Sequence, residues 1–148
     1  MESSGEVFLL SLYPGDNYSI EGDNPAVHPT VTSYEKFTHT WAITNSGTVP
    51  WNGRFLELIN QKGIAPTAEP SRVDIPPTKP RESAPVTVSF DARAMDGSYE
   101  SIWRMKDSQE RPCVPNKEGL RLIINVSFKL YLERQKAASE AAIQKTEV

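Results

Sequence analysis

The chain has 148 residues, of which 38% are hydrophobic and 24% charged, and its formal net charge is −3. This length favours one domain with a core of useful size, and the composition argues against wholesale disorder. The acidic balance provides no basic field for phosphates, so we expect no nucleic-acid binding through this chain alone. No apolar run approaches the roughly 20 residues that span a bilayer, so we expect no membrane partner.

The N-terminus and the cysteine content predict a cytoplasmic protein, or a piece of a longer cytoplasmic one. Residues 1–6 are acidic and polar and lack the positive region of a secretory signal, so we expect a flexible N-terminus there. The single Cys113 cannot form an internal disulfide, which fits a reducing compartment.

Strand signals in the first half of the chain are short and separated by turn residues. Residues 7–12 form a compact apolar run that ends in the turn-rich segment 13–17. Residues 34–45 alternate with a period of two, and residues 55–60 form the next predicted strand. Within the alternating segment one face carries the larger side chains, Phe37, His39, Trp41 and Ile43. We expect Trp41, and likewise Trp103 further along the chain, to pack in the core.

A proline-rich segment follows. Six prolines lie between Gly63 and residue 85. Proline cannot donate to a β-ladder, so we predict a loop with at most an edge strand at residues 72–75. The segment is too long for a plain hairpin and suits a crossover between two sheets.

The second half of the chain shows two long alternations. After residues 86–90, the Asp96-Gly97 turn precedes a strand at residues 99–106, and residues 107–119 read as a loop. One face of the first alternation carries Tyr99, Ser101, Trp103 and Met105; the second alternation comprises Leu122, Ile124, Val126, Phe128 and Leu130. Six or seven such strands predict an all-β, immunoglobulin-like antiparallel sandwich over residues 7–130.

The last residues, 131–148, change character. They are rich in Ala, Glu, Lys and Gln and contain neither Gly nor Pro, so they permit a helix. Few large apolar side chains are present to dock such a helix, so we predict a C-terminal tail that is either helical or disordered.

The strand sequences resemble a known family. Residues 37–51 read Phe-x-x-x-Trp-x-Ile-x-Asn-x-Gly-Thr-x-x-Trp, followed by APVTVSF at 84–90, GSYESIWRM at 97–105 and LIINV at 122–126. This order is similar to that of the four-tryptophan (FW) domain, an immunoglobulin-like module of a selective-autophagy cargo receptor and of several bacterial proteins. The resemblance covers roughly residues 7–130. It implies protein binding and no enzymatic activity.

One position departs from the family pattern. The family's fourth tryptophan normally follows a leucine in the last strand, and here Ile123 occupies the matching place, leaving Trp41, Trp51 and Trp103. An aliphatic residue can replace a packing tryptophan but would replace a ligand-contacting indole poorly.

The predicted binding surface consists of two loops. Trp51 follows a turn, where an indole either closes the end of a sandwich or lies open as a binding anchor. The binding residues we predict are Trp51, Asn52 and Arg54 in one loop and Asp107, Gln109 and Arg111 in the other. A protein or peptide partner would dock on these loops or on an exposed sheet edge, with strand addition as one mode.

No residue pattern predicts catalysis, a metal or a cofactor. His28, His39 and Cys113 do not have zinc spacing; His28 lies in a Pro-flanked loop, and His39 suits a buried, hydrogen-bonded imidazole. No Gly-x-Ser-x-Gly elbow is present, and Asp96 and Glu100 read as polar residues around a turn. Cys113 lies in a loop that could be accessible, but no neighbouring motif lowers its pKa. We therefore predict a non-enzyme.

Two other functions remain open at this point. The sandwich could be a structural or assembly spacer in a larger protein, with self-association through the tail. It could also bind carbohydrate, for which a solvent-facing row of aromatic side chains is required.

Overall fold

A computed structural model describes residues 12–20 and 29–146 of the chain. Most of the predicted strand at residues 7–12, and also His28, lie outside these described residues. The elements that follow one another along the chain are β1 (Ser19–Ile20), β2 (Thr30–Thr32), β3 (Lys36–Thr44), β4 (Phe55–Leu58), β5 (Thr67–Ala68), β6 (Arg72–Asp74), β7 (Ser83–Asp91), β8 (Gly97–Lys106), β9 (Leu120–Ser127) and α1 (Phe128–Thr146).

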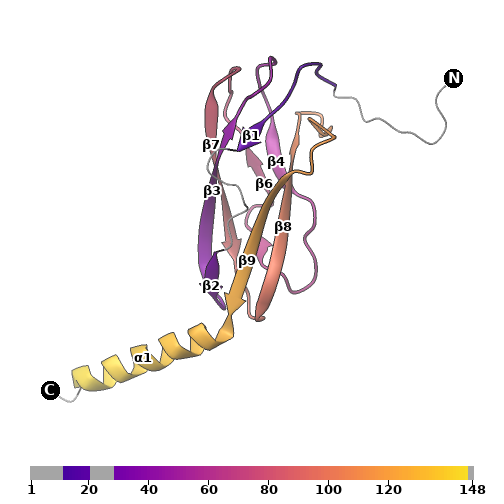
Figure 1. The fold of residues 1–148 in the computed structure, drawn as a ribbon. Coiled ribbons are helices and arrows are strands. Elements are labelled where there is room, and N and C mark those ends of the chain that lie inside the picture. Colours follow the sequence, from indigo (N-terminus) through magenta and orange to yellow (C-terminus); the bar gives the residue numbers. More distant parts are fainter. Residues whose placement is uncertain (1–11, 21–28, 147–148) are drawn as a thin grey trace.

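The strands form two sheets that face each other (Figure 1). One sheet has the order β1-β3-β7-β5, and the other has the order β2-β9-β8-β4-β6. Neighbouring strands are antiparallel except β2, which runs parallel to β9. The all-β sandwich predicted from the sequence is therefore confirmed.

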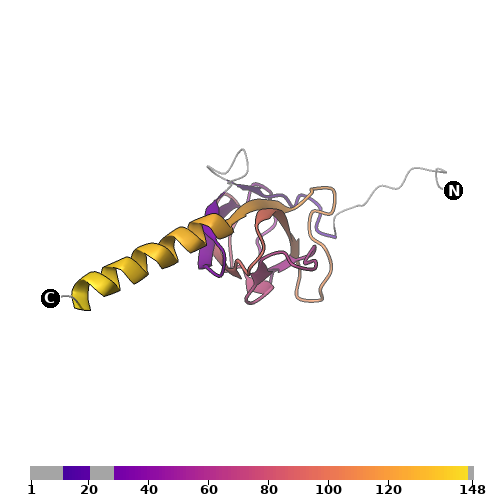
Figure 2. The ribbon, with the colours of Figure 1, turned by 90° about the horizontal axis from the view of Figure 1, so that it is seen from below.

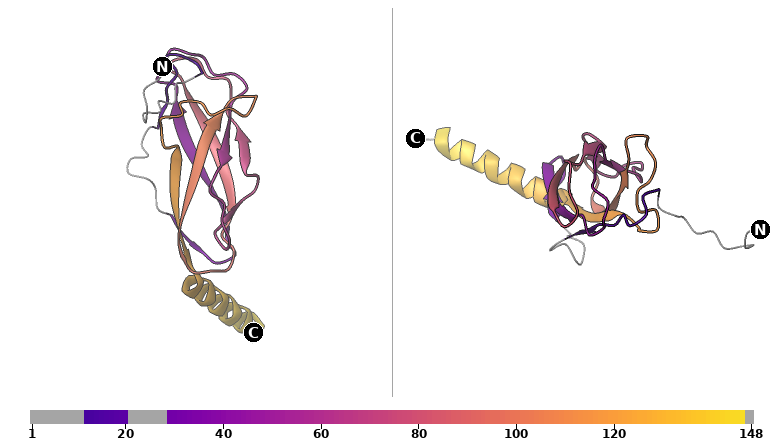
Figure 3. Two further views of the ribbon diagram at one scale, coloured as in Figure 1. Left: turned by 90° about the vertical axis from the view of Figure 1, so that its right-hand side faces the viewer. Right: turned by 90° about the horizontal axis from the view of Figure 1, so that it is seen from above.

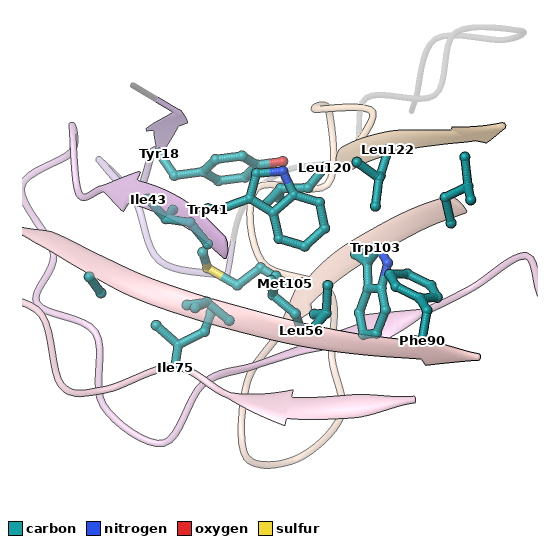
Figure 4. Packing of buried hydrophobic residues seen from close by; sticks show 14 of the residues in the cluster. Tyr18, Trp41, Ile43, Leu56, Ile75, Phe90, Trp103, Met105, Leu120 and Leu122 are labelled. Atoms are coloured by element: carbon teal, nitrogen blue, oxygen red, sulfur yellow. The ribbon is translucent and has the colours of Figure 1, made fainter. Parts of the chain in front are cut away.

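The core lies between the sheets because β3, β7, β8 and β9 each turn every second side chain inward. Trp41 and Trp103 are 1% and 0% exposed, so both are core residues as predicted. The Trp103 ring meets Trp41 and Phe90 edge-on, with centroid separations of 6.2 and 6.0 Å. Figure 4 shows these rings with Tyr18, Met105 and Leu122 in one continuous cluster. Ile123 instead lies half-buried on the outer face of β9, so it leaves no gap in the core.

The proline-rich segment crosses between the sheets, as predicted. β5 joins the edge of the four-stranded sheet, and β6 joins the edge of the five-stranded sheet. The edge strand expected at residues 72–75 is therefore confirmed as β6. The two-residue β5 was not predicted, since it is too short to show a period.

The strand signal at Phe128 and Leu130 is wrong, because β9 ends at Ser127 and α1 begins at the next residue. The Ser127 hydroxyl accepts a hydrogen bond from the Leu130 amide at 3.1 Å, and the Asp96 carboxylate accepts one from the Phe128 amide. Both acceptors satisfy amides of the first helical turn, which otherwise have no partner. The helix then projects away from the sandwich (Figures 2 and 3). Within the described residues, no helix is long and apolar enough to cross a membrane.

Candidate functional site

The two loops predicted to bind meet at the end of the sandwich opposite α1, which we call the loop end (Figure 3, right). Tyr13, from the segment before β1, connects them. Its ring centroid lies 4.6 Å from the guanidinium carbon of Arg54, and its hydroxyl donates a hydrogen bond to Asp107 at 2.9 Å. Three segments that are far apart in sequence therefore converge on this end.

A buried ion pair joins Arg54 to Asp16. Arg54 Nη1 lies 2.8 Å from both carboxylate oxygens of Asp16, and the two side chains are 2% and 0% exposed. Trp51 Nε1 donates a further hydrogen bond to Asp16 at 3.1 Å. Charges removed from water are tolerated only with such partners. The pair thus fixes the segment before β1 against the loop that precedes β4.

Asp107 organises the second loop. One of its carboxylate oxygens accepts hydrogen bonds from the backbone amides of Gln109 at 3.0 Å and Arg111 at 2.9 Å. The other accepts from the Tyr13 hydroxyl and from Arg111 Nε at 3.0 Å. Burial by itself would raise the pKa of Asp107, but these hydrogen bonds outweigh it and hold the pKa below its usual value. The ionised carboxylate is therefore the form that shapes the loop.

The six predicted binding residues divide into two groups. Trp51, Arg54 and Asp107 are only 1%, 3% and 2% exposed. These three side chains are therefore buried, and each makes a hydrogen bond inside the protein. Asn52, Gln109 and Arg111 are exposed and lie directly beside the buried set. The structure brings the two loops together, and of the six predicted residues it exposes these last three.

Sequence reasoning missed Tyr13 and Asp16, which connect the loop end. The turn-rich segment 13–17 gave a signal for a turn but none for a partner. Asp16 and Arg54 lie 38 positions apart, so no local spacing relates them.

A hollow of about 470 Å³ lies on one flank of the loop end. Its lining is mixed: Gly53 and Ser108 come from the two loops, and Asp74, Pro76 and Pro77 follow from β6 and the segment after it. The guanidinium of Arg72, also in the lining, sits 3.5 Å above the Phe55 ring. The hollow thus combines proline rings with the charged groups of Arg72 and Asp74.

The described residues contain no group of three His, Cys, Asp or Glu side chains placed to hold a metal ion. His39, half-buried on β3, packs edge-on against Trp41 with a centroid separation of 4.8 Å. Cys113 is buried rather than accessible, and burial raises its pKa to about 11. The thiol is therefore almost wholly protonated at neutral pH and is a poor nucleophile.

The two sheets, the aromatic core and the ordered loop end define an immunoglobulin-like β-sandwich. Residues 27–126 match the family model described as the Ig-like domain from next to BRCA1 gene. This match covers more than half of the chain, which therefore belongs to that family.

Comparison with solved structures gives weaker likenesses. The PapD-like domain 7 of human CEP192, an ASH / PapD-like domain, is 17% identical with a TM-score of 0.41, covering 86% of this chain and 95% of that one. The secreted serine protease VesC from Vibrio cholerae is 15% identical with a TM-score of 0.37 over 76% of this chain and 23% of the protease. Both scores are too low to carry an argument. No curated protein matches the sequence.

Proposed function

We propose that this chain is a non-catalytic protein-recognition module of the four-tryptophan type, and that a partner protein docks on the loop end. Family membership supports an interaction or scaffold role, and the strand motifs that end in Trp41, Trp51 and Trp103 support the four-tryptophan type. All three indoles are core residues, so they build the scaffold rather than the contact surface.

The observation that carries this proposal is the contrast between buried and exposed residues at the loop end. Asn52, Gln109 and Arg111 are exposed, but the loops beneath them are fixed by the Asp16–Arg54 pair and by the four hydrogen bonds to Asp107. Loops that are already ordered lose little conformational entropy when they bind, which favours affinity. The exposed side chains are amide and guanidinium groups, which suit a polar partner surface rich in carbonyl or carboxylate acceptors.

The test compares the chain with the double variant Asn52→Ala/Gln109→Glu in quantitative affinity capture from the native lysate, because both substitutions leave the hydrogen bonds to Asp107 in place. We expect the partners retained by the parent chain to fall at least tenfold with the variant. Thr38→Ala/Lys129→Glu changes two exposed positions outside the loop end, on β3 and α1, and serves as the matched control. Equal retention by all three proteins, with unchanged circular dichroism, would rule out the loop end as the contact surface.

One observation favours the second candidate, an assembly module that self-associates through α1. Its first turns expose Phe128 and Leu132, which are 39% and 52% exposed. Size-exclusion chromatography of the chain and of the variant Phe128→Ser/Leu132→Ser tests it, since this candidate predicts an oligomer that depends on these two exposed side chains. For the third candidate, carbohydrate binding, the three indoles do not supply the required row of solvent-facing aromatic side chains, because all three are buried.

A further inference from the structure

The five-stranded sheet has an incomplete ladder where β4 leaves β8. The two strands pair from Phe55, opposite Lys106, to Leu58, opposite Trp103, and the Ile59 amide adds one bond to the Ile102 carbonyl at 2.9 Å. Beyond that point the Asn60 side chain takes the place of a strand. Its Oδ1 accepts from the Ile102 amide and its Nδ2 donates to the Glu100 carbonyl, both at 2.8 Å.

The backbone groups beyond Asn60 face an open edge. The N–H and C=O of Ile102 point toward β4, and in an antiparallel sheet every second residue points the same way. The Glu100 amide and both the amide and the carbonyl of Ser98 therefore face the side that β4 has left. Their neighbours Tyr99 and Ser101 point to β9 instead, opposite Ile124 and Leu122. In the described part of the chain, no backbone group completes the ladder on the open side.

A hollow of about 350 Å³ borders this edge. Ser98 and Glu100 line one side of it, and Lys62 and Ile64 line the other. Ile64 is 53% exposed. Arg93 Nη1 donates to the Gly63 carbonyl at 2.8 Å and to the Ala65 carbonyl at 3.3 Å, which anchors the loop that carries Ile64. The open edge thus has an exposed apolar side chain beside it, on the other side of the hollow.

The surroundings of the edge are positively charged. A second hollow, of about 550 Å³, lies on the outer face of the sheet and shares Glu100 with the first. The charged side chains that line the two hollows are Lys62, Arg104, Lys117, Arg121, Glu100 and Glu118. Cations therefore outnumber carboxylates here, in a chain whose net charge is −3. Arg121 Nε lies 2.7 Å from a Glu100 carboxylate oxygen, so these two charges offset each other and the excess positive charge comes from Lys62, Arg104 and Lys117.

We propose that a partner protein adds an antiparallel strand to residues 98–100 of β8, in line with β4. The added strand would be an extended segment in which apolar and acidic residues alternate. The open donors and acceptor would bond its backbone, Ile64 and Ile59 would contact its apolar side chains, and the surrounding cations would attract its carboxylates. This inference rests on the proposed role in protein recognition, but it uses a different surface from the loop end.

The probe is a phage-displayed library of random 12-residue peptides selected on the full chain, followed by synthesis of the most enriched peptide. We expect selected peptides to alternate apolar and acidic residues. Glu100→Pro removes the open amide, and proline is tolerated where the N–H of an edge faces outward. Its affinity for the peptide should fall at least tenfold. Glu100→Gln keeps the amide and frees the Arg121 cation from its carboxylate partner, so its affinity for the acidic peptide should not fall below that of the parent.

Hydrogen exchange on the unaltered chain provides a second measurement that does not depend on how the proline variant folds. Binding should slow exchange at the amides of Ser98 and Glu100. Three outcomes would overturn the proposal: no peptide is enriched in the selection, Glu100→Pro and Glu100→Gln lose the same affinity for the peptide, or the peptide slows hydrogen exchange only at other residues. The loop-end variant Asn52→Ala/Gln109→Glu should bind the peptide as the parent does. If the loop-end variant lost affinity for the peptide, the peptide would bind at the loop end. That result would overturn the edge proposal and leave the proposed function intact.

Discussion

The two ends of the sandwich use aromatic and charged residues in opposite ways. At the loop end, Trp51 and the charged groups of Asp16 and Arg54 are buried and bonded to one another. At the other end, where α1 begins, Tyr34 and Leu132 are 55% and 52% exposed. The contacts there are a ring pair between Tyr34 and Tyr131, with centroids 5.0 Å apart, and a 3.5 Å ion pair between Arg134 and Glu35.

This difference shows which end depends on its polar groups for folding. A charge that is buried must keep its partner, so removing either member of the Asp16–Arg54 pair leaves an uncompensated charge. An exposed ion pair such as Arg134–Glu35 stays hydrated, and pairs of that kind contribute about 0–1 kcal/mol. Substitutions should therefore affect stability strongly at the loop end and weakly at the helix end.

Arg54→Ala should have the largest effect. It leaves the Asp16 carboxylate buried without its cation, so we expect the free energy of unfolding to fall by about 3–5 kcal/mol. Denaturant unfolding followed by tryptophan fluorescence measures this change. Lys36→Ala is the matched control, because the Lys36–Glu69 pair is 74% and 52% exposed, and it should change stability by less than about 0.5 kcal/mol. Similar losses in both variants would show that the pair is not buried in solution.

The Asp107 loop predicts an intermediate effect that depends on pH. The native pKa of Asp107 lies below the value of about 3.9 expected in the unfolded chain. Its carboxylate therefore stabilises the fold above that pH, and this contribution is lost as the pH falls through the lower native pKa. Asp107→Asn should cost about 1–3 kcal/mol at pH 7, because the amide cannot accept all four hydrogen bonds.

Unfolding free energies measured between pH 7 and pH 2.5 test this prediction. The parent chain should lose more stability on acidification than Asp107→Asn, so the two curves should converge at low pH. The exposed Asp74→Asn serves as the control and should follow the parent. Parallel curves for the parent and Asp107→Asn would contradict the assigned role.

The long strands could be predicted from the sequence because each buries one face. In β3, β8 and β9 the apolar side chains recur at every second position, so the inward-facing residues can be identified from the strand's own sequence, whichever strands lie beside it. The same alternation caused the end of β9 to be predicted too late. Phe128 and Leu130 continue the apolar pattern beyond Ser127, and two apolar residues at this spacing fit a helical turn as well as a strand. Ser127 was the local signal for a helix start.

The candidate site was only half predictable. The two loops could be named from the sequence as turn-rich segments, but the sequence did not show that they lie at the same end of the sandwich, and whether Trp51 is exposed depends on what covers it. The cover includes Asp16 and Tyr13, whose partners Arg54 and Asp107 lie 38 and 94 positions away. Charged residues separated by such distances give no periodic pattern, so burial of this network could be seen only in the folded chain.

The smallest effect is expected from removing residues 136–148, which form most of α1. The contacts that hold α1 to the sandwich, from Tyr131 and Arg134, lie in its first turns and would remain. An isolated helix of this length is marginal in water and by itself adds little to the stability of a neighbouring domain. We therefore expect the free energy of unfolding to change by less than about 0.5 kcal/mol at low protein concentration. A loss above about 1.5 kcal/mol would mean that these residues pack against another surface; if the loss grows with concentration, that surface belongs to a second copy of the chain.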